Sequence, residues 1–174
     1  EFYIKIGLVL MGAEVLFQTL AKAGAFGLAQ ALLVVVVVWY FCYWLAGRLG
    51  VDREFAAILA TGVSVCGVSA AIAAGGALKG DPKKVSHTIS LVLVVAVPML
   101  VLEPLLARLL NLSALVVGAW LGGTIDTTGA VVAAGTIAGK EALDLAVIVK
   151  MAQNALIGVI AVLLAVWSVM RKKE

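Results

Sequence analysis

The sequence predicts an all-α integral membrane protein with about four full transmembrane helices and two repeated helical elements, each interrupted by polar residues. The chain has 174 residues, of which 64% are hydrophobic and 13% are charged, and its mean hydropathy is +1.16. In soluble domains about a quarter of the residues are charged. Several apolar runs also approach or exceed the ~20 residues that a helix needs to cross a bilayer. Together with the repeat, these observations predict a multi-pass membrane protein.

Four apolar stretches are expected to cross the membrane as helices: residues 3–20, 26–47, 85–110 and 142–170. The second stretch has the clearest pattern, because the aromatic residues from Trp39 to Trp44 suit one membrane interface. Pro98 and Pro104 are expected to kink the third stretch, since proline removes a backbone hydrogen bond from a helix. These four stretches are the four full transmembrane helices that the sequence predicts.

The repeated elements lie between the spans, at residues 53–80 and 113–139. Gly62–Gly75 and Gly122–Gly135 align at a constant offset of 60 residues, with glycine at both ends and shared alanines between them. Each element is long enough for two half-helices around a polar break. Paired Gly-interrupted hydrophobic segments at corresponding positions are the best sequence indication of a binding site in a transporter.

Each repeated element could cross the membrane as a broken helix or turn back as a re-entrant hairpin. If both cross, the loop Lys and Arg residues divide seven to five between the two sides of the membrane. If both turn back, the division is nine to three, which fits the positive-inside rule better. The re-entrant alternative also makes the two elements enter from opposite faces, as an inverted repeat.

The breaks themselves, residues 64–69 and 124–129, predict a polar cavity. Non-helical backbone inside a membrane is tolerated only where protein or water satisfies it. The second half-helix of each element would direct its free N–H groups at this cavity and favour an anion. Ser69, and Thr127 or Thr128, are expected to cap these half-helices. The alternative is that the hydroxyl residues only cap the helices and the glycines only allow close packing.

Ionisable residues within apolar stretches are hypotheses for functional residues by default. Asp126 lies in the second break and is predicted to be a coupling residue, or else an interfacial loop residue. Lys150 lies inside the last span, and it could pair with Asp126 or Glu14, bind an anion or extend to the interface. Glu14 is a second candidate coupling residue. Glu103, which precedes Pro104, is expected to be only a charge near the end of its helix.

The candidate substrate-binding residues come from the two breaks and the last span: Ser64, Cys66, Gly67, Ser69, Thr124, Thr127, Thr128, Lys150 and Asn154. Cys42 and Cys66 lie in apolar surroundings, and they suggest neither a disulfide framework nor a thiolate metal site. No metal-ligand spacing, nucleophile motif or phosphate loop occurs, so we expect no metal, no cofactor and no enzymatic activity. The sequence lacks a basic patch with interleaved aromatic residues, so we do not expect it to bind nucleic acid.

Four ordered motifs carry a resemblance to a known family. They are residues 7–12, 64–70, 122–135 and 149–151, with the sequences GLVLMG, SVCGVSA, GGTIDTTGAVVAAG and VKM. With these motifs the chain resembles the YeiH-type family, which is named for sulfate export and grouped with bile-acid/sodium symporter-like transporters. The resemblance covers about the central half of a typical member. It implies that residues 1–174 form a single transmembrane domain that is a fragment of a larger transporter.

The function expected from this resemblance and from the breaks is export or exchange of a small, sulfate-like anion across the inner membrane. One alternative is a proton- or sodium-coupled carrier of organic acids on the same scaffold, in which Asp126 binds the coupling ion. Another is a structural membrane subunit that transports nothing itself. The expected partners are therefore the anion, H⁺ or Na⁺ and the lipid bilayer, and the sequence is compatible with a homo-oligomer.

Overall fold

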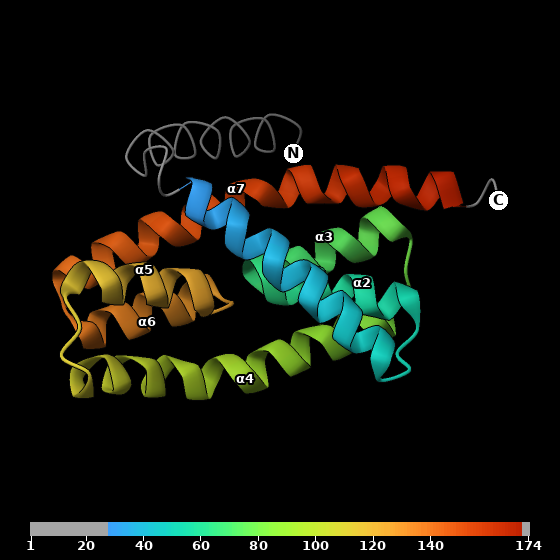
Figure 1. Cartoon of the computed structure of the whole chain (residues 1–174). Helices are drawn as coiled ribbons and strands as arrows, with labels where there is room; N and C mark the ends of the chain where they lie inside the picture. The colour runs from blue at the N-terminus through green and yellow to red at the C-terminus, as the bar shows by residue number, and fades with distance from the viewer. Residues whose placement is uncertain (1–27, 172–174) are drawn as a thin grey trace, which may run out of the picture.

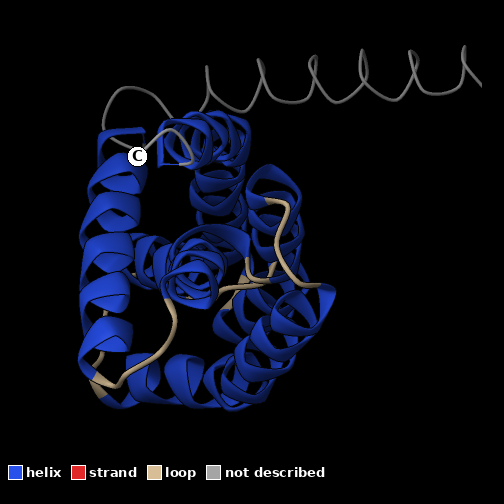
Figure 2. Cartoon of the chain, turned by 90° about the vertical axis from the view of Figure 1, so that its right-hand side faces the viewer, coloured by secondary structure: helices blue, strands red, loops and turns tan. Residues whose placement is uncertain are grey.

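The computed structural model describes residues 28–171, and these residues form helices joined by short loops, without a strand (Figure 2). Three helices are long and apolar enough to cross a membrane: Leu28–Arg48, α4 (Pro82–Leu109) and α7 (Lys140–Arg171). They correspond to three of the four predicted spans. The remaining predicted span, residues 3–20, lies outside the described residues.

The first repeated element consists of α2 (Arg53–Thr61), the π-helical turn η1 (Gly62–Cys66) and α3 (Val68–Leu78). Its two ends lie side by side, because the Asp81 amide donates to the Glu54 carboxylate over 3.0 Å. Lys84 also pairs with Asp52 at 2.9 Å and with Glu54 at 3.3 Å. The element is therefore a hairpin whose tip is the π-helical turn (Figure 1).

The second repeated element consists of α5 (Ala114–Thr124), a short non-helical break and α6 (Thr128–Ala138). It also turns back on itself, and in Figure 1 its tip points toward the tip of the first hairpin. The long helix α4 runs between the outer ends of the two hairpins, so the hairpins approach each other from opposite ends of the bundle (Figure 1). α4 is continuous through Pro98 and Pro104.

Close helix packing holds the second hairpin against α7. A Cβ atom on Gly122 would collide with the Ala146 carbonyl, and one on Gly118 would lie 2.8 Å from the Ala142 carbonyl. Small residues four apart let helix backbones approach closely inside a membrane, where burial of apolar area does not drive helix association. Large apolar side chains of the three long helices meanwhile remain exposed on the surface, as expected for contact with lipid.

The helix Leu28–Arg48 lies across both hairpins. Its Trp39 Nε1 donates to Thr61 Oγ1 of α2 over 3.0 Å, and its Gln30 Nε2 donates to the Ala119 carbonyl of α5 over 3.3 Å. These two contacts tie the hairpins to one common element.

Candidate functional site

The two polar breaks meet at the centre of the described bundle. A Cβ atom on Gly67 would lie 3.2 Å from Thr127 Cγ2 and 3.6 Å from Asp126 Cβ. Cys66 Sγ of the first break lies 3.7 Å from Thr128 Oγ1 of the second. Residues 59 to 62 positions apart in the sequence therefore lie together at the tips of the two hairpins.

The backbone conformation at Gly67 makes this contact possible. Its φ of 51° and ψ of −100° end the π-helical turn, and its N–H donates to the Gly62 carbonyl over 2.8 Å. Positive φ is readily available to glycine and costly for other residues. A side chain here would also collide with Val92, at 2.7 Å from its Cγ1. The first break is therefore built around a position that only glycine fills without strain.

Lys150 of α7 joins the two breaks. Its side chain is 1% exposed, and its Nζ donates to the Val65 carbonyl in the first break over 3.0 Å. The same Nζ donates to Gln153 Oε1 over 2.8 Å. Gln153 Nε2 in turn donates over 3.1 Å to the carbonyl of Gly123, at the end of α5. The Lys150 ammonium is thus linked to the first break directly and, through Gln153, to the backbone of α5. We call the place where the two breaks meet the crossing point.

Asp126 supplies a negative charge at the same place. It is 7% exposed, and it interacts electrostatically with Lys150 and Glu103. Within residues 28–171, no ion pair shorter than 4.0 Å joins Asp126 to a basic side chain. Lys150 and Asp126 therefore interact electrostatically without a direct ion pair.

Asn154 has a buried polar atom without a partner. Its Nδ2 donates to Thr128 Oγ1 over 3.2 Å, whereas its Oδ1 is buried and has no hydrogen-bond partner among the described residues. An unsatisfied buried polar atom costs about 1–3 kcal/mol, so Oδ1 is a position where a water molecule or a hydrogen-bond donor of a ligand would be stabilised.

The predicted caps are partly wrong. Thr127 is the N-cap of α6, and its Oγ1 accepts from the Ala130 amide over 3.4 Å, as expected for one of the two threonines. Ser69, however, does not cap α3: the N-cap is Gly67, without a side-chain hydrogen bond, and Ser69 is an exposed residue of α3. The π-helical turn carries the chain past Cys66, so α3 begins at Val68, before Ser69.

Two other candidates lie at the edge of the crossing point. Ser64 is buried, but its Oγ donates over 3.4 Å to the carbonyl of Thr61, within its own hairpin. Thr124 is exposed, and its hydroxyl contacts Glu103 of α4. Glu14 lies outside the described residues.

Glu103 is the residue whose importance the sequence reading missed. It is not a charge at a helix end, because it is 7% exposed and lies 2.8 Å from the Thr124 hydroxyl beside the second break. Arg108, farther along α4, does not pair with Glu103, because the Arg108 guanidinium donates to the Ile137 carbonyl. The position of Glu103 inside an apolar span was the sequence feature that could have indicated a functional role. Gln153, which no motif singled out, was missed as well.

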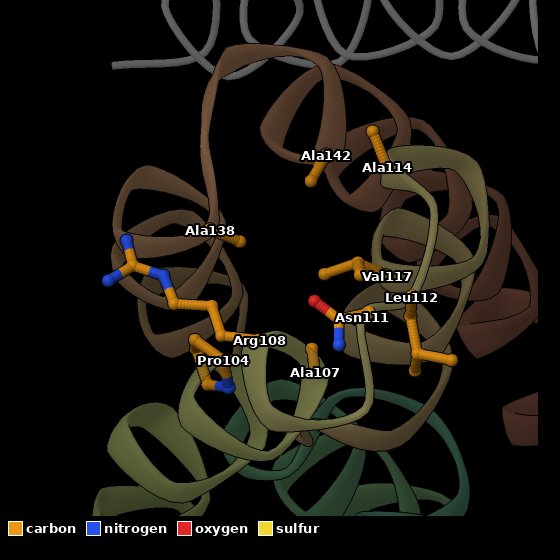
Figure 3. A pocket seen from close by; sticks show the side chains of 9 residues that line it. All are labelled: Pro104, Ala107, Arg108, Asn111, Leu112, Ala114, Val117, Ala138 and Ala142. Carbon is orange, nitrogen blue, oxygen red and sulfur yellow. The ribbon is translucent and has the colours of Figure 1, made fainter.

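A cavity of about 500 Å³ lies away from the breaks, where the ends of α4 and α6 meet the starts of α5 and α7. Its walls include Pro104, Val117 and Ala142, and the Arg108 guanidinium points away from the enclosed space (Figure 3). Because none of the predicted site residues lines this cavity, we do not assign it to the site. Among residues 28–171 no three His, Cys, Asp or Glu side chains gather in a way that could hold a metal ion.

The comparison with known proteins gives the family. A family model described as "Conserved hypothetical protein 698" matches residues 1–174. The chain belongs to the UPF0324 family of membrane proteins. This agrees, at the level of the family, with the YeiH-type resemblance of the four sequence motifs.

Relatives within the UPF0324 family are similar over nearly the whole chain. A UPF0324 membrane protein of Rhodopirellula baltica is 44% identical over 169 residues, covering 96% of this chain and 31% of the relative. One from Nitratidesulfovibrio vulgaris is 39% identical, covering 96% and 29%, and one from Yersinia pestis is 29% identical, covering 96% and 48%. The chain thus spans about a third to a half of these relatives. No solved structure matches it.

Proposed function

We propose that this chain forms the substrate-binding part of a secondary transporter for a small anion in the inner membrane. The observation that carries the proposal is the buried ammonium of Lys150, which donates to the backbone of the first break and is linked through Gln153 to the backbone of α5 just before the second break. A charged side chain buried in a membrane protein marks a substrate or ion pathway by default. Because substrate sites in transporters with internal repeats lie where the repeats meet, the position of Lys150 supports a binding role.

The hairpin geometry supports the re-entrant alternative and an inverted repeat. Both ends of the first hairpin lie together, and the tips of the two hairpins meet from opposite ends of α4. An anion at the tips would face the Lys150 ammonium and the N-terminus of α3, which no side chain caps. In this proposal Cys66, Thr128 and Asn154 provide neutral contacts and Asp126 binds the coupling ion.

A carrier of organic acids coupled to H⁺ or Na⁺ is the second candidate. The observation that favours it is the second buried carboxylate, Glu103, close enough to Asp126 for the two to interact electrostatically. Two acidic groups at one site suit a cation or proton that travels with the substrate better than they suit an anion alone.

Uptake into proteoliposomes tests the proposal and separates the two candidates. The full-length protein is assayed with sulfate, sulfite and small carboxylates, with and without imposed proton and sodium gradients. We expect Lys150→Met to weaken apparent affinity about 10- to 100-fold, because a hydrogen bond to a charged group contributes about 1.5–3 kcal/mol.

Lys140→Met is the matched control, since Lys140 is an exposed lysine at the start of the same helix. It should leave uptake unchanged. Equal uptake by the two variants would contradict a binding role for Lys150, and no uptake of any tested anion by the intact protein would contradict both candidates.

A further inference from the structure

Glu103 has no charged partner in the described part of the chain. Its carboxyl oxygens lie 3.1 and 2.8 Å from Thr124 Oγ1. No Lys, Arg or His side chain within residues 28–171 lies within 4.0 Å of it. A buried carboxylate without a cation or several hydrogen-bond donors is strongly unfavourable. The surroundings therefore favour a carboxyl group that carries its proton.

The hydrogen bonds at Thr124 lead to the same conclusion by a count of protons. Thr124 Oγ1 lies 2.8 Å from the Trp120 carbonyl as well as 2.8 Å from Glu103 Oε2. A carbonyl and an ionised carboxylate only accept hydrogen bonds, and a hydroxyl has one proton to donate. With Glu103 ionised, one of the two contacts lacks a proton. With Glu103 neutral, its O–H donates to Thr124, and Thr124 donates to Trp120.

The neighbouring charges are consistent with a neutral Glu103. α5 and α6 pack against α4 here, and neither carries an ionisable side chain. Among the described residues, Asp126 in the break interacts electrostatically with Glu103 and with Lys150 of α7, and Lys150 interacts in turn with Cys66 of η1. Arg108 lies farther along α4. Arg108 donates to the Ile137 carbonyl. Among residues 28–171, Lys150 is the basic group that interacts with Asp126, and its single charge balances only one of the two buried carboxyl groups if both are ionised.

We propose that Glu103 is a proton-carrying residue that binds and releases one H⁺ beside the second break. In the form seen here it is the neutral acid. On release, the O–H bond of Glu103 breaks, the proton passes to water, and the Thr124 hydroxyl turns from the Trp120 carbonyl to the new carboxylate. Thr124 is exposed, so the pair lies one side chain away from the surface.

The change of hydrogen-bond partner at Thr124 links the protonation of Glu103 to the shape of the site. Thr124 is the last residue of α5, and Asp126 follows two residues later. When Thr124 leaves the Trp120 carbonyl, the last turn of α5 loses a hydrogen bond at the point where the break begins. The use of this step to couple proton movement to substrate movement rests on the proposed transport function, whereas the protonation of Glu103 does not.

Infrared spectroscopy of the purified full-length protein tests the protonation directly. We expect a C=O stretch of a neutral carboxyl group that is absent from Glu103→Gln and present in Asp126→Asn. Thr124→Val should shift this band to higher frequency, because the carboxyl group loses its hydrogen-bond partner. A spectrum that is identical in wild type and Glu103→Gln would overturn the proposal, as would a band that Thr124→Val leaves unmoved.

Uptake under an imposed proton gradient tests the coupling step separately. We expect Glu103→Gln to abolish the stimulation by the gradient, and the exposed Glu141→Gln at the start of α7 to keep it. Full stimulation in Glu103→Gln would overturn the coupling role. Absence of uptake in wild type would instead contradict the proposed transport function, and the infrared result would still decide whether Glu103 carries a proton.

Discussion

Gly67 lies where the two breaks meet. Substitution by alanine places a side chain at positive φ and 2.7 Å from Val92 Cγ1. We expect Gly67→Ala to lower the free energy of unfolding by about 1–3 kcal/mol, from backbone strain and overpacking combined. The measurement is thermal or denaturant unfolding of the protein in detergent.

Gly76→Ala is the control for this prediction. Gly76 lies within α3 and has no atom within 4 Å of the position that a Cβ would take. Since alanine is favoured over glycine in a helix by up to ~1 kcal/mol, this variant should be as stable as wild type or more stable. A Gly67→Ala variant of equal stability to Gly76→Ala would show that the tips are not packed as described.

At the scale of single residues, the sequence singled out most of the polar residues that lie at the crossing point. Asp126, Lys150 and Asn154 were found because polar or charged groups are conspicuous within apolar helices, and the structure places them at the crossing point. Ser69 was misplaced because nothing in the sequence distinguishes a π-helical turn from an ordinary helix end. Glu103 was missed because its partner Thr124 is 21 residues away along the chain.

Among the helices, α2 depends on the cap supplied by Asp52. Asp52 Oδ1 accepts from the Glu54 and Phe55 amides, each over 3.1 Å, and pairs with Lys84 over 2.9 Å. The hydrogen bond from Lys84, followed by that from the Phe55 amide, lowers the pKa of Asp52 below its ordinary value. The same carboxylate therefore caps α2 and links it to α4.

We expect Asp52→Ala to lower the free energy of unfolding by about 1 kcal/mol at neutral pH, which is the usual cost of losing such a cap. Because the pKa is lower in the folded state, the stabilisation is complete above the ordinary pKa of aspartate. It disappears as the pH falls through the lowered value. Unfolding experiments over this acidic range check the prediction. The difference between wild type and Asp52→Ala should shrink on acidification, and a constant difference would contradict it.

The positions of the long helices along the chain could largely be predicted from composition. The path of the two repeated elements, which either cross the membrane or turn back, could not. Apolar runs predicted the three long described helices to within a few residues of their ends. Whether each repeated element crosses or turns back depended on a difference of a few loop charges. In the structure the ends of the first element are joined by contacts such as Glu54 with Asp81, which have no signature in the local sequence.

At the scale of the whole molecule, two hairpins from opposite ends of a bundle bring two sequence-repeated breaks together around one buried lysine. The repeat predicted that the breaks belong together, because a duplicated element would place them at equivalent positions. It did not predict that α7 supplies the connection, through Lys150 and Gln153. Membership of the UPF0324 family fits this membrane architecture, and the proposed transport function depends on the contact between the breaks.

Disulfide cross-linking between the breaks tests this contact most directly. In a Cys42→Ser background, Thr128→Cys places a second thiol opposite Cys66, where Sγ and Oγ1 now lie 3.7 Å apart. Thr136→Cys is the control, since it lies about 12 Å farther along α6 at 1.5 Å per residue. After mild oxidation and proteolysis, mass spectrometry should detect a Cys66–residue 128 linkage and none to residue 136. Failure of the first linkage, or equal yields of both, would contradict the meeting of the two breaks.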